Sequence, residues 1–304
     1  MTGLLLVVGS YNVGLTVVGR SLPLPGQTVL GHTFDMGPGG KGSNQAIGAR
    51  RLGAQVDLVV KLGNDRFADD ARELFAREGL SGSGILAADT HTGVGLILVD
   101  DQGNNMIAIH PGANALLHAE DLDRLPGIFD RASHLLCQLE SPVELFAEAA
   151  GRARRRGLTT ILNPAPARPL PVETLSLADL MTPNEGELGT LTGLPVGSER
   201  EVREAASVLL DKGVGQAVVT LGERGALWVH AGGTQHFPAH RVPVRDTTGA
   251  GDAFNAGLAT ALTEGRDMPA AIELGIRAAA FCVGRLGVID GLPTRRQLDA
   301  EVPA

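Results

Sequence analysis

The sequence predicts an α/β fold in which a mostly parallel central sheet lies between helices and carries a small β-sheet lid. From residue 134 onward, short apolar runs typical of buried strands alternate with segments whose apolar residues recur at helical spacing. Nearer the start, segments within 11–36 and 92–110 alternate polar and apolar residues, which indicates antiparallel strands exposed on one face. We expect residues 1–304 to form one domain, with these strands as its lid.

In the first half of the chain, strand 4–8 is an apolar run that ends at Gly9-Ser10. Strands 16–18 and 27–34 flank a turn rich in proline and glycine, and a glycine-rich loop at 37–42 leads into a helix at 43–52. A buried strand at 56–62 and an amphipathic helix at 67–78 follow. Strands 93–99 and 106–110 flank the polar turn 100–103 and so predict a second hairpin.

The second half keeps the alternation of strands and helices. Apolar runs predict strands at 135–138, 159–162, 179–182, 217–221 and 226–230. Helical spacing predicts helices at 142–156, 185–191, 199–212, 249–264 and 269–283. Because crossovers between parallel strands place helices over the sheet, we expect both of its faces to be covered.

Composition excludes several classes of protein. Of 304 residues, 43% are hydrophobic and 20% charged, as in a soluble globular protein, and the net charge of −8 argues against binding nucleic acid or anionic membranes. No apolar stretch approaches the roughly 20 residues of a membrane span, and we expect no signal peptide. Cys137 and Cys282 lie in apolar contexts without metal-site spacing, so we expect buried thiols in a reducing cytoplasm.

The strongest chemical signal is residues 246–254, Asp-Thr-Thr-Gly-Ala-Gly-Asp-Ala-Phe, directly before a helical pattern. The small residues Gly249, Ala250 and Gly251 let backbone N–H groups converge at the helix start, where unsatisfied donors and the helix dipole favour an anion. Asp252 in the first turn can accept a proton from a hydroxyl bound beside that anion. Taken alone, the motif equally fits a carboxylate that only complements the helix dipole.

Residues 246–254 resemble the C-terminal signature of the PfkB carbohydrate kinases, which have the ribokinase-like fold. Residues 39–46, Gly-Gly-Lys-Gly-Ser-Asn-Gln-Ala, resemble the other signature of that family. Segments 109–115, 138–142, 163–167 and 182–185 are similar to those of ribokinases in particular. The matches follow the family order over residues 5–293, which is far more specific than any single glycine motif.

The resemblance implies ATP-dependent phosphorylation of a primary hydroxyl of a small sugar, D-ribose to ribose 5-phosphate. It makes Asp252 the catalytic base and the amides of Gly249, Ala250 and Gly251 the anion hole. The residues that it places around the sugar are Asn12, Gly39, Gly40, Lys41, Asn44, Glu140 and Asp252. Amides and carboxylates suit sugar hydroxyls, although Asn12 and Asn44 also fit ordinary turn or cap positions. For Lys41 we favour a structural or rim role over phosphate contact.

The resemblance also implies nucleotide and metal sites. Asn184, Thr220, Gly222, Gly225 and Gly251 would lie along ATP. Asn184 and Glu187 would hold Mg²⁺, partly through water, although Asn184 also fits a plain helix N-cap. Asp246, the Thr248 carbonyl and Gly287 would form a monovalent-cation site, so we expect activation by K⁺. Because lids of ribokinases pair across a dimer, we also expect a homodimer.

Three positions depart from the ribokinase pattern. Gly14 stands where ribokinases carry an aspartate that holds two sugar hydroxyls, and losing a charged hydrogen bond costs roughly ten- to hundredfold in affinity. Ile276 lies where a polar residue is common, and Gly291 lies where a serine is common near the cation site. Gly14 leaves phosphoryl transfer untouched but weakens the assignment to ribose.

Two alternative functions therefore remain open, and a third is excluded. The chain could be a kinase of another sugar or of a nucleoside. It could also be a non-catalytic sugar-binding regulator, although such a protein has no need of Asp252 as a base. A dinucleotide-binding oxidoreductase fails for want of a Gly-x-Gly-x-x-Gly turn after the first strand.

Overall fold

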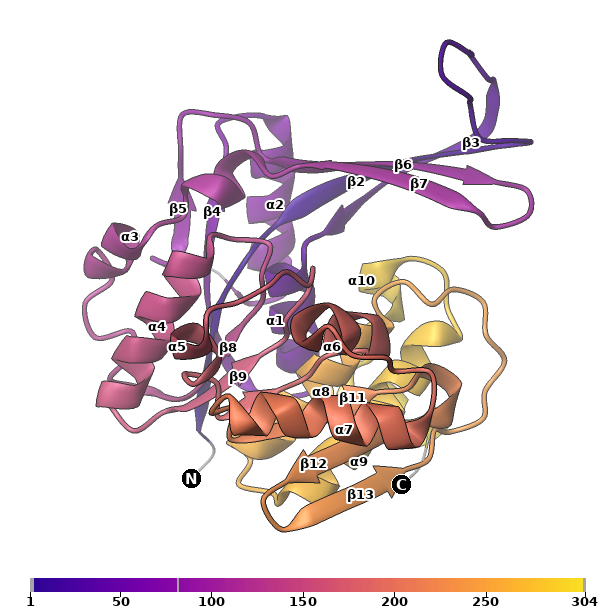
Figure 1. Cartoon of the computed structure of the whole chain (residues 1–304). Helices are drawn as coiled ribbons and strands as arrows, with labels where there is room; N and C mark the ends of the chain where they lie inside the picture. The colour runs from indigo at the N-terminus through magenta and orange to yellow at the C-terminus, as the bar shows by residue number, and fades with distance from the viewer. Residues whose placement is uncertain (1–2, 81, 303–304) are drawn as a thin grey trace.

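The computed structural model describes residues 3–80 and 82–302, so the ends of the expected 1–304 domain lie outside the described residues. Nine strands form one sheet in the order β13-β12-β11-β10-β9-β8-β1-β4-β5 (Figure 1). Every neighbouring pair from β11 to β5 is parallel, and only β11-β12 and β12-β13 are antiparallel. The strands are β1 Leu4–Val8, β4 Gln55–Leu62, β5 Ile85–Ala87, β8 Ala132–Cys137, β9 Thr159–Leu162, β10 Leu180–Met181, β11 Gln216–Thr220, β12 Ala226–His230 and β13 Gly233–Phe237.

Helices cover both faces of this sheet, as β1 illustrates. Leu5 and Val7 belong to an apolar cluster with helices α1, α2, α8 and α9, whereas Leu6 and Val8 belong to a second cluster with α4, α6 and α7. A strand buried on both faces must be apolar throughout, which is why its sequence shows no alternation. The helices are α1 Lys41–Arg51, α2 Arg66–Arg77, α3 Ala119–Asp123, α4 Val143–Arg155, α5 Val172–Leu175, α6 Glu185–Thr192, α7 Glu199–Asp211, α8 Ala250–Thr263, α9 Met268–Val283, α10 Val288–Gly291 and α11 Arg295–Glu301.

A separate four-stranded sheet, here called the lid, has the order β3-β2-β6-β7 and extends beyond the body of the molecule (Figure 1). Its strands are β2 Asn12–Gly19, β3 Gly31–Gly39, β6 Gly93–Asp100 and β7 Asn105–His110. β2-β3 and β6-β7 are antiparallel hairpins, and parallel pairing of β2 with β6 joins them. The β-sheet lid expected from sequence is thus one continuous sheet.

The expected strand 27–34 is wrong in its boundaries. β3 begins at Gly31 and continues to Gly39, beyond the limit of 36, so the first residues of the glycine-rich segment are strand and not loop. Gly37 pairs with Gly14 and Gly39 with Asn12. Glycine has a weak preference for strands, so this extension depends on the neighbouring strand and leaves no local signal.

Two smaller expectations have clear outcomes. Cys137 and Cys282 are both free and buried, as their apolar contexts indicated. Among the helices of the described residues, none combines the length and the apolar character that crossing a bilayer requires.

Candidate active site

The candidate site lies where the parallel strands of the large sheet end. The carboxyl ends of β1, β8, β9 and β10 lead into Ser10, Glu140, Asn163 and Thr182 respectively, and Thr220 is the last residue of β11. The chain order reverses around β1, which has β8 on one side and β4 on the other. Ligands of open α/β sheets bind at such an edge, because the diverging loops leave a crevice there.

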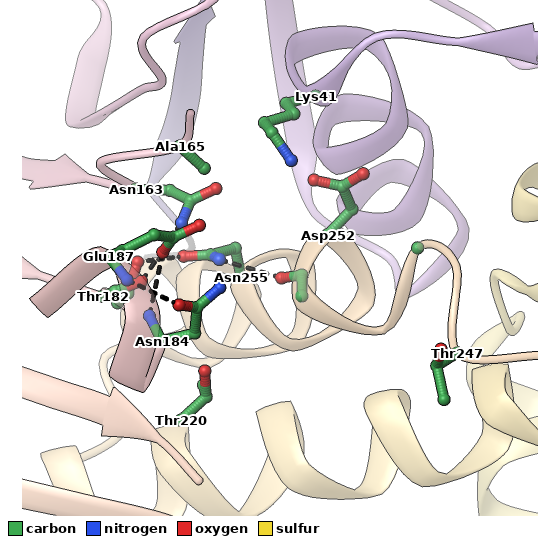
Figure 2. A pocket seen from close by; sticks show the side chains of 12 residues that line it. Lys41, Asn163, Ala165, Thr182, Asn184, Glu187, Thr220, Thr247, Asp252 and Asn255 are labelled. Atoms are coloured by element: carbon green, nitrogen blue, oxygen red, sulfur yellow. Dashed lines mark hydrogen bonds between the residues drawn. The ribbon is translucent and has the colours of Figure 1, made fainter. Parts of the chain in front are cut away.

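A cavity of about 220 Å³ opens at this edge. The predicted residues that line it are Lys41, Asn184, Glu187, Thr220, Gly249, Gly251 and Asp252. Asp252 and Lys41 approach it from one side, whereas Glu187 and Asn184 face them from the other (Figure 2). The predicted base, the two glycines of the predicted anion hole and the predicted Mg²⁺ residues therefore share one space, whereas Ala250, Asp246, Thr248 and Gly287 do not line it. Gly222 and Gly225 are absent from this lining.

Asp252 is held by side-chain amides of helix α1. Asn44 Nδ2 donates to Asp252 Oδ2 at 2.8 Å, and Gln45 Nε2 donates to Asp252 Oδ1 at 2.9 Å. The carboxyl group is buried in the first turn of α8, with the residue 7% exposed. Buried carboxylates need such donors, because an unpartnered charge would strongly destabilise the fold. The carboxylate is fixed in direction at the cavity wall.

The start of α8 requires glycine. Gly249 is the N-cap with φ of 83°, and a Cβ there would lie 2.9 Å from Val288 Cγ1. A side chain would meet both a strained backbone and a clash. At Gly251, by contrast, an added Cβ has no described atom within 4 Å, so this turn is open toward the cavity. The Ala250 amide donates to the Thr247 carbonyl at 3.3 Å, whereas the N–H group of Gly251 is available to an anion.

A second polar cluster centres on Glu140. Its Oε2 accepts from Ser10 Oγ at 2.6 Å, from the Lys41 amide at 2.9 Å and from Asn12 Nδ2 at 3.3 Å. Asn12 is itself held by Asn114, whose Nδ2 donates to Asn12 Oδ1 at 2.9 Å. All three hydrogen bonds converge on one oxygen, so Oε1 is left for a ligand hydroxyl.

Asn44 offers a hydrogen-bond acceptor next to the base. Its Nδ2 binds Asp252, while its buried Oδ1 has no hydrogen-bond partner among the described residues. An unpartnered buried acceptor is unfavourable unless a ligand completes it, and a hydroxyl could do so. Asn44 Oδ1 thus offers a hydroxyl an acceptor next to the base, and Glu140 lies near Lys41, which is also near Asp252.

The glycine loop allows α1 to start against the end of β1. A Cβ at Gly40, whose φ is 91°, would lie 2.6 Å from Tyr11 Cα, and a Cβ at Gly42 would lie 2.4 Å from the Ser10 amide nitrogen. Both contacts are with backbone, which cannot move aside cheaply. Close approach therefore explains these glycines and brings Lys41 and Asn44 to the site.

Lys41 and Glu187 have altered pKa values. Burial lowers the pKa of Lys41, but the carboxylates of Asp252, Glu140 and Glu187 outweigh burial and hold this pKa above its usual value. Burial raises the pKa of Glu187, against the opposing effects of the Asn184 amide and Lys41. Lys41 lines the cavity and points toward Asp252 (Figure 2).

Asn184 and Glu187 form a reciprocal N-terminal cap of α6. Asn184 Oδ1 accepts from the Glu187 amide, and Glu187 Oε2 accepts from the Asn184 amide, both at 2.8 Å. The plain N-cap role therefore exists. The same residues also line the cavity, and Glu187 keeps its second oxygen there. One carboxylate oxygen and an amide suit Mg²⁺, which retains water and takes few protein ligands. The described residues contain no group of three or more His, Cys, Asp or Glu side chains suited to a metal.

The three expected cation-site residues lie together. Asp246 Oδ1 accepts from the Thr248 amide at 2.9 Å, and Asp246 Oδ2 accepts from the Gly287 amide at 3.2 Å. Cys282 lies beneath this loop, and its Sγ is 3.6 Å from the Thr248 carbonyl oxygen. A Cβ at Gly291 would lie 2.9 Å from that sulfur. The glycine that departs from the ribokinase pattern therefore makes room for Cys282.

Sequence reasoning missed several polar residues of the site. Gln45, Asn163, Thr182 and Asn255 surround Asp252 or the cavity, and Asn114 supports Asn12. Gln45, Asn114, Asn163 and Thr182 fall inside the quoted motifs, which was the available signal. Asn255, one turn beyond Asp252 on α8, had none that sequence alone could distinguish from a helix surface residue.

Comparison with known proteins agrees with this geometry. The model of the pfkB family carbohydrate kinases matches residues 2–295. A ribokinase of Haemophilus influenzae is 37% identical over 294 residues, with 96% of each chain covered. A deoxyribokinase of Salmonella typhi is 36% identical over 295 residues, again with 96% of each chain covered. The Arabidopsis thaliana ribokinase, solved with ribose and ATP, has a TM-score of 0.90 and 30% identity, covering 98% of both chains.

A cavity that joins a buried carboxylate to a glycine-started helix can bind a phosphoryl group and accept a proton, which is the equipment of a phosphotransferase. The matches extend over nearly the whole chain and agree with its fold. The chain belongs to the pfkB family of carbohydrate kinases. It is an ATP-dependent sugar kinase with the ribokinase-like fold.

Proposed function

We propose that this kinase transfers the γ-phosphoryl group of ATP to the primary hydroxyl of D-ribose, giving ribose 5-phosphate. The observation that carries the proposal is the buried Asp252 carboxylate, which Asn44 holds in the first turn of α8 at the wall of the cavity. The relatives named above support ribose, since they include ribokinases and one solved with ribose and ATP.

In this mechanism Asp252 accepts the proton of the sugar hydroxyl as its oxygen attacks the γ-phosphorus. A bond forms between that oxygen and phosphorus, the bond from phosphorus to the β–γ bridging oxygen breaks, and ADP leaves. Amides of Gly249, Ala250 and Gly251 hold the transferred group, whose charge they stabilise. Closure of the lid over the sugar excludes water, which would otherwise compete as acceptor.

The nucleotide and its ions are assigned by position. We place the ATP phosphates along Asn184, Thr220 and the start of α8, with adjacent Gly222 and Gly225 toward the rest of the nucleotide. Mg²⁺ bound with the phosphates would neutralise their charge, and Glu187 with Asn184 would hold it, partly through water. K⁺ at Asp246, the Thr248 carbonyl and Gly287 would stabilise the loop that leads into the anion hole.

A second candidate substrate is 2-deoxy-D-ribose. Gly14 offers no side-chain acceptor beside the sugar cluster, so a substrate with one hydroxyl fewer loses less there than ribose does. The 36% identity to a deoxyribokinase gives this candidate independent support. We also propose a cytoplasmic location, which suits two free buried thiols, and a homodimer, which would cover the exposed apolar residues of the lid.

The test is ADP release from Mg·ATP with D-ribose, 2-deoxy-D-ribose, fructose and several nucleosides, each in potassium or sodium. We expect turnover of ribose or deoxyribose, faster in potassium, and loss of all but a few per cent of kcat in Asp252→Asn. Turnover only of a nucleoside would overturn the pentose assignment. Full activity of Asp252→Asn would refute its role as the base, and equal rates in both salts would refute the cation site.

A further inference from the structure

Gln45 lies at the centre of a buried chain of amides that ends at Asp252. The residue is 0% exposed and sits on α1, next to Asn44. Gln45 Nε2 donates to Asp252 Oδ1 at 2.9 Å and to Asn163 Oδ1 at 3.0 Å. Gln45 Oε1 accepts from Gln138 Nε2 at 2.6 Å. One amide thus contacts three elements, α8 and the ends of β9 and β8.

The direction of this amide is fixed by its acceptors. An ionised carboxylate only accepts hydrogen bonds, so the NH₂ group of Gln45 must face Asp252. Asn163 Nδ2 donates to the Thr182 carbonyl at 3.1 Å, which also only accepts, so Asn163 presents its oxygen to Gln45. Two independent acceptors therefore demand the same orientation. Gln138 completes it by donating to the remaining oxygen of Gln45.

We propose that Gln45 is a positioning residue for the catalytic base, holding the Asp252 carboxylate aimed at the substrate hydroxyl through an amide direction set by Asn163 and Gln138. The inference rests on the proposed role of Asp252. With Asn44 on Oδ2 and Gln45 on Oδ1, each oxygen has one donor, and the carboxylate cannot rotate without losing both. A reversed Gln45 amide would instead place its oxygen against the carboxylate.

Other charged and titratable groups also face Asp252. They are Lys41 on α1, Glu187 on α6 and Cys282 on α9. None of them donates a hydrogen bond to Asp252 in the described structure, whereas Gln45 and Asn44 do. Changing Gln45 therefore alters the direct contacts of the carboxylate while leaving this surrounding charge in place.

The test is the pH dependence of kcat in Gln45→Leu and Gln45→Glu. Hydrogen-bond donors favour the ionised carboxylate, so their loss in Gln45→Leu should move the acid limb of kcat upward by about one pH unit. Gln45→Glu keeps the shape but places two carboxylates together, and its acid limb should move further. kcat should fall at least tenfold in both, with KM for the sugar changing less. Gln138→Leu, which frees the amide to reverse, should give a smaller shift in the same direction.

Thr260→Val is the matched control. Thr260 is 0% exposed on α8, and its hydroxyl donates to the Ala256 carbonyl at 2.7 Å, away from the cavity. It should lower thermal stability as any lost buried hydrogen bond does, yet leave the kcat profile in place. If the Gln45 variants lose thermal stability but keep the native pH dependence of kcat, Gln45 has only a structural role and the proposal is overturned.

A measurement that does not depend on turnover distinguishes the role of Gln45 from the role of Asp252 as the base. Carboxyl carbon NMR of aspartate-labelled protein follows the Asp252 signal, identified by its loss in Asp252→Asn, against pH. Its midpoint should rise in Gln45→Leu, and an unchanged midpoint would refute the positioning role. An active Asp252→Asn would instead refute the base itself, whatever the Gln45 variants do.

Discussion

At the residue scale, two residues of β2 shape the proposed sugar end of the site. Asn12 provides an amide side chain, whereas Gly14 has no side chain that could accept a hydrogen bond. Both residues lie on β2 two positions apart, so they face the same side of the lid, the side of Glu140. Gly14 pairs with Gly37 on β3 and Gly95 on β6, so three strands present bare backbone in one row. This part of the wall offers no side chain to a sugar hydroxyl.

Restoring a carboxylate at position 14 should favour ribose over 2-deoxyribose. A Cβ there would lie 3.6 Å from Ile97 Cδ1 and 3.7 Å from the Gly37 carbonyl oxygen, both ordinary contacts, so Gly14→Asp should fold. The ratio of kcat/KM for the two sugars should shift toward ribose by roughly ten- to hundredfold. Gly14→Ala adds the Cβ without the acceptor and should leave the ratio unchanged. Equal ratios in both variants would contradict the prediction.

At the scale of elements, the connection from β1 to β2 depends on burying Tyr11 between the glycine loop and the core. The ring packs edge-on against Phe75 of α2, with centroids 5.5 Å apart, and is 2% exposed. Burial, with the charges of Asp70 and Asp65, raises the pKa of Tyr11 to about 12 from 10.0. The folded state therefore favours the neutral phenol of Tyr11 over the phenolate.

Stability should consequently fall at alkaline pH. The folded pKa lies above the unfolded one, so this contribution is complete below about pH 10 and disappears as pH rises toward 12. The difference corresponds to about 2–3 kcal/mol. Denaturant unfolding should show that the free energy of unfolding falls over that pH range in the native protein but not, through this residue, in Tyr11→Phe. Tyr11 is the single tyrosine, so tyrosinate absorbance reports it directly. Ionisation near pH 10 in the folded protein would refute the prediction.

At the scale of the whole molecule, the lid leaves a large apolar face uncovered. Phe34, Met36, Leu96 and Met106 are 66%, 50%, 54% and 52% exposed. The pairing register puts all four on the face opposite Asn12 and Gly14. Exposed apolar area of this kind is unusual in a monomer, which is why we propose that a second copy covers it.

A charge on that face should dissociate the dimer. Met36→Asp would bury an unpaired carboxylate in each half of the interface, so sedimentation should give the monomer mass. Ile107→Asp is the control, since Ile107 is 57% exposed on the opposite face of β7 and should leave the dimer intact. A monomeric native protein, or a dimer that survives Met36→Asp, would refute the assignment.

Some elements of the fold could be predicted from the sequence and others could not. Strands 4–8, 159–162 and 226–230 match β1, β9 and β12, because buried strands are apolar runs with clear breaks. β5, β13, α3, α5, α10 and α11 were missed, since these elements are short or polar and depend on neighbours for their stability. The role of Asp252 and of the glycines around it could be predicted from their contiguous motif. The hydrogen bonds that hold Asp252 could not, because their donors lie on a distant segment.

The sequence by itself determined the α/β class, the phosphotransferase motifs and the family, because apolar periodicity and glycine-rich helix starts are local features of a chain. Only the tertiary structure decided that Gln45 faces Asp252, 207 positions away, and that Gln138 and Asn163 set its direction. It also decided that two hairpins form one lid through the pairing of β2 with β6. These relations are set when distant segments pack together, and packing leaves no periodic signal along the chain.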